Sequence, residues 1–527
     1  MKRNVLFLLT IIVLAALPLA CNKQDKEHLA DLEDRKAELE STVVDLPEAS
    51  QAPLNNLPIS FDEEYYWVDA AGSVTLHYSL SRPARVEATA GGGWSARVSA
   101  LGEKEGSIVV SAPDPASESV LNVRVTDSEG CTAEKYIRLF VRKPYCNATG
   151  PRIETMAYNG FSDQLATDEN FQKLVEAGIT MLSVEGDYAD IDWRKQCRLA
   201  EKYGIKVVLF IGYSSGCYTI NPENDTVLEN KIREAEQYPA VCAYQIYDEP
   251  GTYVGPSLAL SRKRIAELAP GHPTYINLRP SGGSTEGMGA NTYEDYVEYY
   301  ASVCDLEMIS FDQYPVYEWG VEDEWYHALE VISATARRHS IPFWAFLLSC
   351  REWYRADPCL ENIRLQGNMN LAYGAQCIQF FVWKATSGTN YAPIMNDGEY
   401  KPVYYDCKNY NSELRNREFV FAGCDVHKVR HAGSGSYCHG TYLTAGDYPE
   451  AISDMAIGGD ALVSFVGNRG NEYLVVCNKS WQQKLPVELT FTRTVYTIDR
   501  NGDFTGQRPG TAAFTIDEGD MLVIKWR

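Results

Sequence analysis

Clusters of basic residues are absent from this chain, in which 48 Lys and Arg stand against 71 Asp and Glu for a net charge of −23. Binding to nucleic acid or to an anionic membrane surface needs a basic face, so neither partner is expected. The 14 cysteines include no Cys-x-x-Cys pair, which argues against a zinc site of the usual spacing. No metal and no cofactor is predicted.

The cysteines also lack a pattern that would define disulfides. With Cys21 set aside, 13 remain, an odd number, and several of them lie in apolar stretches, such as Cys242, Cys377 and Cys477. Export permits disulfides, but thiols in apolar strands are typical of small buried hydrophobes. No disulfide connectivity is predicted.

The apolar run at the N-terminus, Val5 to Leu17, is too short to span a membrane comfortably, and it follows the charged residues Lys2 and Arg3. It leads into Leu-Pro-Leu-Ala-Cys21, which resembles the lipobox of bacterial lipoproteins. The resemblance implies a signal peptide over residues 1–20, lipidation of Cys21, and anchoring to the bacterial outer membrane, at the cell surface or on its periplasmic face. A plain secretory signal is the alternative, and both imply export.

At 527 residues the chain is too long for one ordinary domain, and the pattern of charged, polar and apolar residues changes along its length. Residues 21–57 alternate in charge and predict a tether. Residues 58–146 alternate apolar with polar residues between turns, which predicts a small β-sandwich. That stretch resembles the immunoglobulin-like modules ahead of enzymes in secreted bacterial polysaccharide-degrading proteins. Residues 423–527 predict a second β-sandwich, which either packs on the preceding domain or binds sugar.

Between these two segments, residues 150–422 alternate strand with helix. The expected strands are Ile153–Gly160, Ile179–Glu185, Ile205–Tyr213, Val241–Asp248, Pro273–Arg279, Leu306–Tyr314, Pro342–Ser349 and Gln376–Lys384. Alternating units form a parallel sheet, and eight of them in about 270 residues fit a closed (β/α)8 TIM barrel. An open doubly wound sheet is the alternative. It more often has a Gly-rich phosphate loop after the first strand, and Tyr158-Asn-Gly-Phe161 is not one.

The fourth expected strand ends in two adjacent acids, Asp248 and Glu249, followed by Pro250, which has no N–H to continue a ladder. Carboxyls at the point where a strand leaves the core are partly desolvated, which raises their pKa and suits general acid catalysis. Barrel active sites gather at the C-terminal ends of the strands, so we expect Glu249 in the mouth. The alternative is that both acids cap the helix that follows.

The same rule places further candidates around the mouth. They are Tyr158 after strand one, Glu185 after two, Tyr213 after three, Asn277 and Arg279 after five, Asp312 and Tyr314 after six, Ser349 and Glu352 after seven, and Trp383 and Lys384 after eight. Acids and amides read sugar hydroxyls, and aromatic rings stack on pyranose faces. Glycosidic cleavage needs two carboxylates, one to protonate the leaving oxygen and one to attack or to activate water. The set therefore predicts a carbohydrate substrate.

Three motifs carry a resemblance to a known group of enzymes: Tyr247-Asp-Glu-Pro250, Phe311-Asp-Gln-Tyr-Pro315, and the segment Ala372 to Trp383 followed by Asn396 to Pro402. Over residues 150–420 the chain looks like the clan of (β/α)8 glycoside hydrolases and is similar to family 42-type β-galactosidases. That clan has Asn-Glu-Pro at the end of strand four. The resemblance implies cleavage of O-glycosidic bonds with Glu249 as the acid/base.

The chain departs from that clan at strand seven, where a nucleophilic glutamate is expected and Phe343 to Ser349 contains none. Asp312, Glu352 and Glu185 are candidates for the second carboxylate, with Asp312 ranked ahead of Glu352. Asp312 can instead be a hydrogen-bonding acid that fixes the loop before Pro315, and Glu352 can lie in the first turn of a helix. Asp248 replaces the Asn that would hold the 2-hydroxyl of the sugar.

Two functions therefore stay open. One is an exported glycoside hydrolase that acts on a plant or host polysaccharide or its oligosaccharides. The other is a surface glycan-binding protein whose barrel has lost its nucleophile. The two differ in whether a second carboxylate faces Glu249 across the mouth.

Overall fold

The computed structural model describes residues 59–527 apart from 62–64, 70, 102–103, 114–118, 129, 131, 143–151, 186–190, 212–225, 353 and 434–439. The predicted signal peptide, Cys21, the tether and Tyr213 lie outside the described residues. The chain divides into two compact units, one made mostly of residues before Leu139 and the other mostly of residues from Leu139 onward. The predicted domain boundaries within them stay predictions.

The first unit consists of antiparallel strands. They are β1 (Ile59–Phe61), β2 (Tyr65–Asp69), β3 (Ser73–Leu80), β4 (Ala84–Ala90), β5 (Ser95–Leu101), β6 (Glu105–Ser111), β7 (Ser119–Asp127) and β8 (Thr132–Arg142). One sheet has the order β1-β3-β6-β5 and the other has the order β2-β8-β7-β4. Burial alternates along β7, where Leu121, Val123 and Val125 are buried, as a strand with one inward face requires. The immunoglobulin-like classification stays a prediction.

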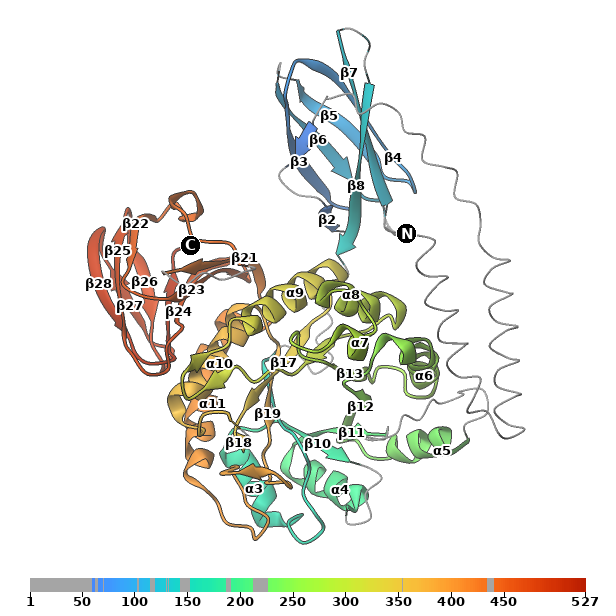
Figure 1. The fold of residues 1–527 in the computed structure, drawn as a ribbon, viewed down its shortest axis with the longest axis vertical. Coiled ribbons are helices and arrows are strands. Elements are labelled where there is room, and N and C mark those ends of the chain that lie inside the picture. Colours follow the sequence, from blue (N-terminus) through green and yellow to red (C-terminus); the bar gives the residue numbers. More distant parts are fainter. Residues whose placement is uncertain are drawn as a thin grey trace, which may run out of the picture. The chain divides into compact units, whose positions relative to one another are not determined.

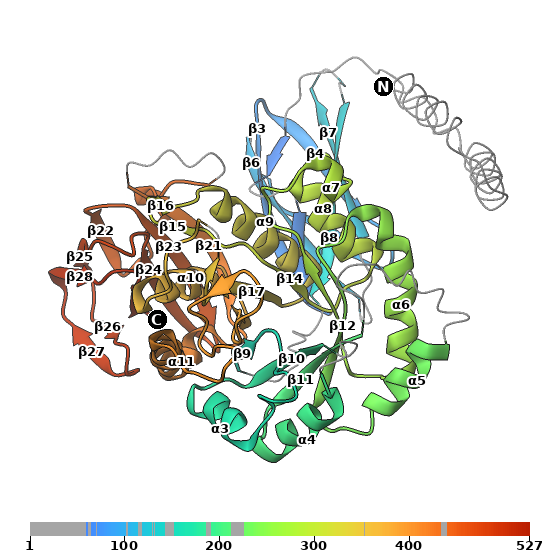
Figure 2. The same cartoon turned by 60° about the horizontal axis from the view of Figure 1, so that its bottom comes forward.

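Eight strands of the second unit close into a barrel in the order β10-β11-β12-β13-β14-β17-β19-β9 (Figures 1 and 2). They are β9 (Glu154–Ala157), β10 (Met181–Glu185), β11 (Lys206–Phe210), β12 (Val241–Asp248), β13 (Thr274–Leu278), β14 (Ile309–Phe311), β17 (Phe343–Leu348) and β19 (Cys377–Phe381). Each lies within its predicted range. The closed barrel is confirmed and the open sheet is wrong, because β19 pairs in parallel with β9.

Helices follow the strands and cover the outside of the barrel (Figure 2). They are α3 (Asp168–Glu176), α4 (Trp193–Tyr203), α5 (Thr226–Ala235), η1 (Thr252–Val254), α6 (Gly255–Leu268), α7 (Thr285–Met288), α8 (Tyr293–Val303), α9 (Glu324–His339), α10 (Leu360–Ala372) and α11 (Pro402–Phe421). Gly204 ends α4 with φ 68°, a left-handed conformation that suits glycine. On α3, Phe171 and Leu174 are buried, whereas Val175 is 46% exposed.

The last segment forms two further antiparallel sheets. Their strands are β21 (Asp425–Ala432), β22 (Ile452–Ile457), β23 (Ala461–Asn468), β24 (Asn471–Asn478), β25 (Leu485–Phe491), β26 (Val495–Ile498), β27 (Phe504–Gln507), β28 (Gly510–Ile516) and β29 (Met521–Lys525), with η2 (Ala445–Asp447) between β21 and β22. The sheet orders are β21-β23-β24-β29-β26-β27 and β22-β25-β28. Residues of both sheets, such as Val463 and Leu489, share one hydrophobic core.

The other face of the larger C-terminal sheet lies against α10 and α11 (Figures 1 and 2). Leu462, Val475 and Val523 belong to the same hydrophobic core as the barrel and its helices. Asn468 Nδ2 donates to the carbonyl oxygens of Phe419, Val420 and Ala422 at 3.1, 3.0 and 3.0 Å, which are the last carbonyls of α11 and the residue after it. The segment therefore packs on the barrel, one of the two roles expected for it.

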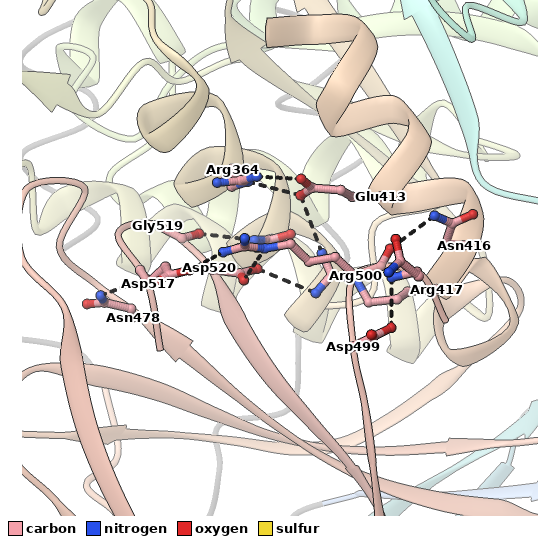
Figure 3. Close-up of polar contacts among 12 residues, drawn as sticks. Arg364, Glu413, Asn416, Arg417, Asn478, Asp499, Arg500, Asp517, Gly519 and Asp520 are labelled. Atoms are coloured by element: carbon pink, nitrogen blue, oxygen red, sulfur yellow. Dashed lines mark hydrogen bonds and ion pairs between the residues drawn. The ribbon is translucent and has the colours of Figure 1, made fainter. Parts of the chain in front are cut away.

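A buried ion network joins the same two parts (Figure 3). Arg417 of α11 is 1% exposed, and its Nη1 lies 3.4 Å from Asp520 Oδ1. Arg500 binds Asp520 and Asp517, each at 2.7 Å. On the barrel side, Arg364 binds both carboxylate oxygens of Glu413, and Oε2 of Glu413 also lies 3.9 Å from Arg417 Nη2. The network fixes the C-terminal sheets to α10 and α11.

Every cysteine in the described residues is a free thiol. Cys377 and Cys477 are buried, Cys242 is half-buried, and burial raises the pKa of the Cys242 thiol to about 12. A neutral buried thiol behaves as a small hydrophobe, as predicted for these three. Within the described residues, no helix is long and apolar enough to cross a membrane.

Candidate active site

Glu249 follows β12 directly, and its backbone is held at both ends. Its N–H donates to the Asn277 carbonyl oxygen at 2.8 Å, and its own carbonyl oxygen accepts from Arg279 Nε at 2.7 Å. Its φ is 51°, a left-handed conformation that costs a non-glycine residue on the order of 1–2 kcal/mol. The helices η1 and α6 that follow have no side-chain cap. The capping alternative is therefore wrong, and Arg279 acts as a positioning residue for Glu249.

Asn277, in β13, joins two of the acids. Its Nδ2 donates to Asp248 Oδ1 at 3.0 Å and to Asp312 Oδ1 at 2.7 Å. Its Oδ1 accepts from Ser310 Oγ at 3.0 Å, which fixes the orientation of the amide. The Asp312 carboxyl is thus tied to β13, and its alternative role of fixing the loop before Pro315 stays a prediction.

Beneath these acids, buried polar side chains cross the interior of the barrel. Tyr275 Oη donates to Gln379 Oε1 at 3.0 Å, and Gln379 Nε2 donates to Ser310 Oγ at 2.9 Å. Gln245 Nε2 donates to Tyr158 Oη at 3.1 Å. Buried polar groups that satisfy one another rigidify their surroundings, so this network supports Asn277 from below. Sequence reasoning missed it, although a glutamine inside each of two apolar strands was a signal.

The electrostatics of the two aspartic acids follow from this burial. Burial and, to a smaller extent, the charge of Glu249 raise the pKa of Asp248 to about 6, against the opposing effect of the Asn277 hydrogen bond. Burial also raises the pKa of Asp312 well above its usual range, and the charges of Glu249 and Asp248 add to the effect. Asp312 therefore keeps its proton far above the range usual for an aspartic acid.

Glu352 lies in β18 (Arg351–Glu352), a short strand after β17 that pairs with β20 (Thr389–Asn390). Because α10 begins only at Leu360, the alternative that placed Glu352 in the first turn of a helix is wrong. Burial raises the pKa of Glu352, and the charge of Glu249 raises it further. A second carboxyl group thus lies close enough to Glu249 for the two charges to interact.

The two glutamates differ from the two aspartic acids in their hydrogen bonds. Asp248 and Asp312 share the amide of Asn277. Among the residues that the structure describes, no group hydrogen-bonds the carboxylate of Glu249 or that of Glu352. A carboxylate that no described residue hydrogen-bonds can bind or react with a ligand without first breaking a hydrogen bond to that part of the chain.

Three further predicted residues lie with these acids. Tyr314 stacks on Phe381 with ring centroids 5.2 Å apart, and the charges of Asp312 and Glu352 help to raise its pKa. The charge of Glu185 contributes to the raised pKa of Tyr158. In the described part of the chain, no three His, Cys, Asp or Glu side chains are grouped as metal ligands.

The predicted residues around strands seven and eight are placed differently. Trp383 is 1% exposed and packs edge-on against Phe380 and against Tyr404 of α11, so its ring is not open to a sugar. The reason is that β19 stops at Phe381, and Trp383 turns outward to the helices. Lys384 is half-buried, with its backbone paired to Ile394. Ser349 is buried, and its Oγ donates to the carbonyl oxygen of Val382 at 3.3 Å.

Comparison with known proteins adds little to this geometry. No protein-family model matches the sequence, and no curated protein matches it. Solved structures of Saccharomyces cerevisiae Gas2p align with the chain, among them complexes with laminaritriose and laminaritetraose (14% identity, TM-score 0.37) and with laminaripentaose (13% identity, TM-score 0.37). The first alignment covers 55% of this chain and 66% of Gas2p, and the second covers 55% and 67%. At such identity and TM-score the likeness supports no inference about site or substrate.

Proposed function

We propose that this protein is a glycoside hydrolase in which Glu249 is the proton donor and Glu352 is the second carboxylate. The observation that carries the proposal is the pair itself. Both glutamates stand at the C-terminal end of the barrel with no hydrogen bond to their carboxylates within the described residues, and the charge of one raises the pKa of the other. Two such carboxylates are the minimum that glycosidic cleavage needs.

Glu352 replaces Asp312 as the preferred partner of Glu249. A group that attacks an anomeric carbon or deprotonates water must be ionised, and burial, which raises the pKa of Asp312 well above its usual range, disfavours the ionised form of that carboxyl. Asp312 is also tied to Asn277 at 2.7 Å. In the proposed reaction Glu249 protonates the glycosidic oxygen, while Glu352 attacks the anomeric carbon or activates water.

The remaining polar groups would orient the sugar. Asp248, with a pKa of about 6, is mostly ionised at neutral pH and can accept a hydrogen bond from a sugar hydroxyl. Protonated Asp312 can donate one, and Asn277 holds both acids at a fixed separation. Tyr314, Tyr158 and Glu185 complete the substrate-binding set that the proposal requires.

The cellular setting is part of the proposal. The lipobox-like segment before Cys21 supports an exported lipoprotein on the bacterial outer membrane, with residues 58–146 as an immunoglobulin-like spacer. The substrate would be a plant or host polysaccharide or its oligosaccharides. The net charge of −23 agrees with a neutral or uncharged glycan more than with an acidic polymer.

The test is hydrolysis of a broad panel of aryl glycosides and oligosaccharides by wild type and three variants. Glu249→Gln and Glu352→Gln are each expected to lower kcat by about 1,000-fold or more, since each removes an obligatory group, which corresponds to about 4 kcal/mol. Glu249→Gln should lose least on dinitrophenyl glycosides, whose leaving group needs no proton. Asp312→Asn should cost about 10–100-fold, and Glu286→Gln, at an exposed position of α7, serves as the matched control.

Two results would contradict the proposal. Wild type inert on the whole panel but retarded by polysaccharides in native gels would favour the glycan-binding protein. An Asp312→Asn variant as inactive as Glu249→Gln, beside an active Glu352→Gln variant, would return the second role to Asp312.

A further inference from the structure

A short hairpin after strand six stands at the rim of the same mouth. It consists of β15 (Val316–Tyr317) and β16 (Gly320–Val321), joined by Glu318 and Trp319. The hairpin is fixed to the loop after strand seven, because the Ala356 N–H donates to the Val316 carbonyl oxygen at 3.1 Å and Tyr317 bridges to Arg355. Two neighbouring rim loops therefore hold this hairpin in one position.

Three planar groups are layered on this hairpin. The Arg355 guanidinium lies 4.1 Å from the centroid of the Tyr317 ring, and the Tyr317 ring stacks on Trp319 with centroids 4.7 Å apart and planes 22° from parallel. Trp319 ends the stack and is 75% exposed. One face of its indole is thus covered by Tyr317, and the other is open to water in a fixed orientation. We call Arg355, Tyr317 and Trp319 the rim stack.

The rim stack is connected directly to the proposed catalytic pair. The Arg355 N–H donates to the carbonyl oxygen of Glu352 at 3.0 Å. Between the two, Tyr354 is 77% exposed, which adds a second exposed ring to the same loop. One backbone hydrogen bond and two ring contacts therefore link Glu352 to Trp319.

The surroundings of Trp319 distinguish between kinds of occupant. A protein interface needs a contiguous apolar patch, whereas the chain neighbours of Trp319 are the exposed Glu318 and the half-buried Gly320. A flat ring with one open face matches a pyranose, which has an apolar face and a polar edge. Glu318, the exposed chain neighbour of Trp319, supplies a hydrogen-bonding group beside the ring.

We propose that the open face of Trp319 binds a pyranose ring of the substrate at the rim of the mouth, so that the enzyme acts on chains of several sugar residues. The inference rests on the proposed function, whose second carboxylate, Glu352, lies in the loop to which the stack is fixed. Covering one indole face removes on the order of 50–100 Å² of apolar surface from water, which corresponds to about 10–60-fold in affinity.

The test compares Trp319→Ala and Trp319→Phe with wild type on one homologous series of oligosaccharides, from two to six residues, chosen from those that wild type cleaves. The loss of kcat/KM with Trp319→Ala is expected to grow with chain length and to reach about 10–60-fold on the hexasaccharide, mostly through KM. Trp319→Phe should recover part of it. Tyr496→Ala removes a 45% exposed ring from β26 of the C-terminal sheets and should match wild type at every length.

A loss of kcat/KM that is the same at every chain length, or no loss, would overturn sugar binding by Trp319 while leaving the proposed hydrolase function intact. Should wild type cleave nothing, the same variants are run in native gels containing β-glucan, xylan, galactan or galactomannan. Retardation that is lost in Trp319→Ala would support sugar binding by Trp319 without hydrolysis. Retardation unchanged by the substitution, or absent from wild type, would overturn it.

Discussion

Asp248→Asn is expected to stabilise the protein at neutral pH, which is unusual for a substitution in a candidate active site. Burial raises the pKa of Asp248 from its ordinary 3.8 to about 6. The folded state therefore binds the proton more tightly than the unfolded chain does, and stability falls as pH rises from about 4 to 6. Relative to a protein in which Asp248 stays protonated, the loss in unfolding free energy is about 1 kcal/mol at pH 4.5 and about 3 kcal/mol at pH 7.5.

An amide has no charge to desolvate and still accepts the Asn277 hydrogen bond, so the variant avoids this loss. Its advantage over wild type should be about 3 kcal/mol at pH 7.5, or about 4 °C in the melting temperature of a unit of this size. Because the charge of Asp248 also raises the pKa of Asp312, that pKa should fall in the variant. Activity should decrease about tenfold, since a neutral acceptor holds a sugar hydroxyl less strongly.

Thermal and urea denaturation of both proteins at pH 4.5 and 7.5 measures the effect. Asp454→Asn, at an exposed position on β22, is the control and should change stability at neither pH. A gain in unfolding free energy of equal size at both pH values would refute the electrostatic reasoning, since Asp248 destabilises the folded state only when it is ionised. A loss of stability at pH 7.5 would show that the buried charge is better compensated than its surroundings indicate.

Two further predictions concern the junction with the C-terminal sheets. Lys479 lies beside a cavity of about 530 Å³ and 4.3 Å from the Tyr326 ring, and burial lowers its pKa to about 7. The unfolded chain therefore binds this proton more tightly, so the free energy of unfolding should rise from pH 7 to 10. Lys479→Met should flatten that rise in a series of denaturation curves over this pH range. An unchanged pH slope would contradict this. Asp520→Ala leaves buried Arg417 with only the Glu413 oxygen at 3.9 Å and should cost about 3–5 kcal/mol on denaturation, against under about 1 kcal/mol for the more exposed Asp517→Ala. Equal losses would contradict the role of burial.

The barrel was predictable because its parallel strands are buried on both faces and read as apolar runs. The end of β12 at Asp248 was predicted correctly, since Pro250 has no backbone N–H to continue the strand pairing. The place of Glu352 was not predictable in the same way. It depends on the pairing of β18 with Thr389 and Asn390 in a later loop, a contact that no local pattern encodes.

Two other features needed tertiary information. Trp383 lies beyond the end of β19, where the alternation of strand faces no longer applies, so its direction followed from packing against Tyr404. The burial of α10 on opposite sides has two sources, since Asn370 donates to the Phe346 carbonyl oxygen of β17 and Asn368 donates to that of Gly519, about 150 residues later. The second source depends on the C-terminal sheets, which no local pattern on α10 encodes.

The shared core between α10, α11 and the larger C-terminal sheet has a consequence for how such proteins diversify. An ordinary accessory domain can be gained, lost or exchanged at a linker, because each partner keeps a complete surface of its own. Here, removal of β21 to β29 would expose Arg417 and the apolar outer sides of two barrel helices. A descendant could discard the C-terminal sheets only by redesigning two helices at once, so the pair should be inherited together and should melt in a single transition.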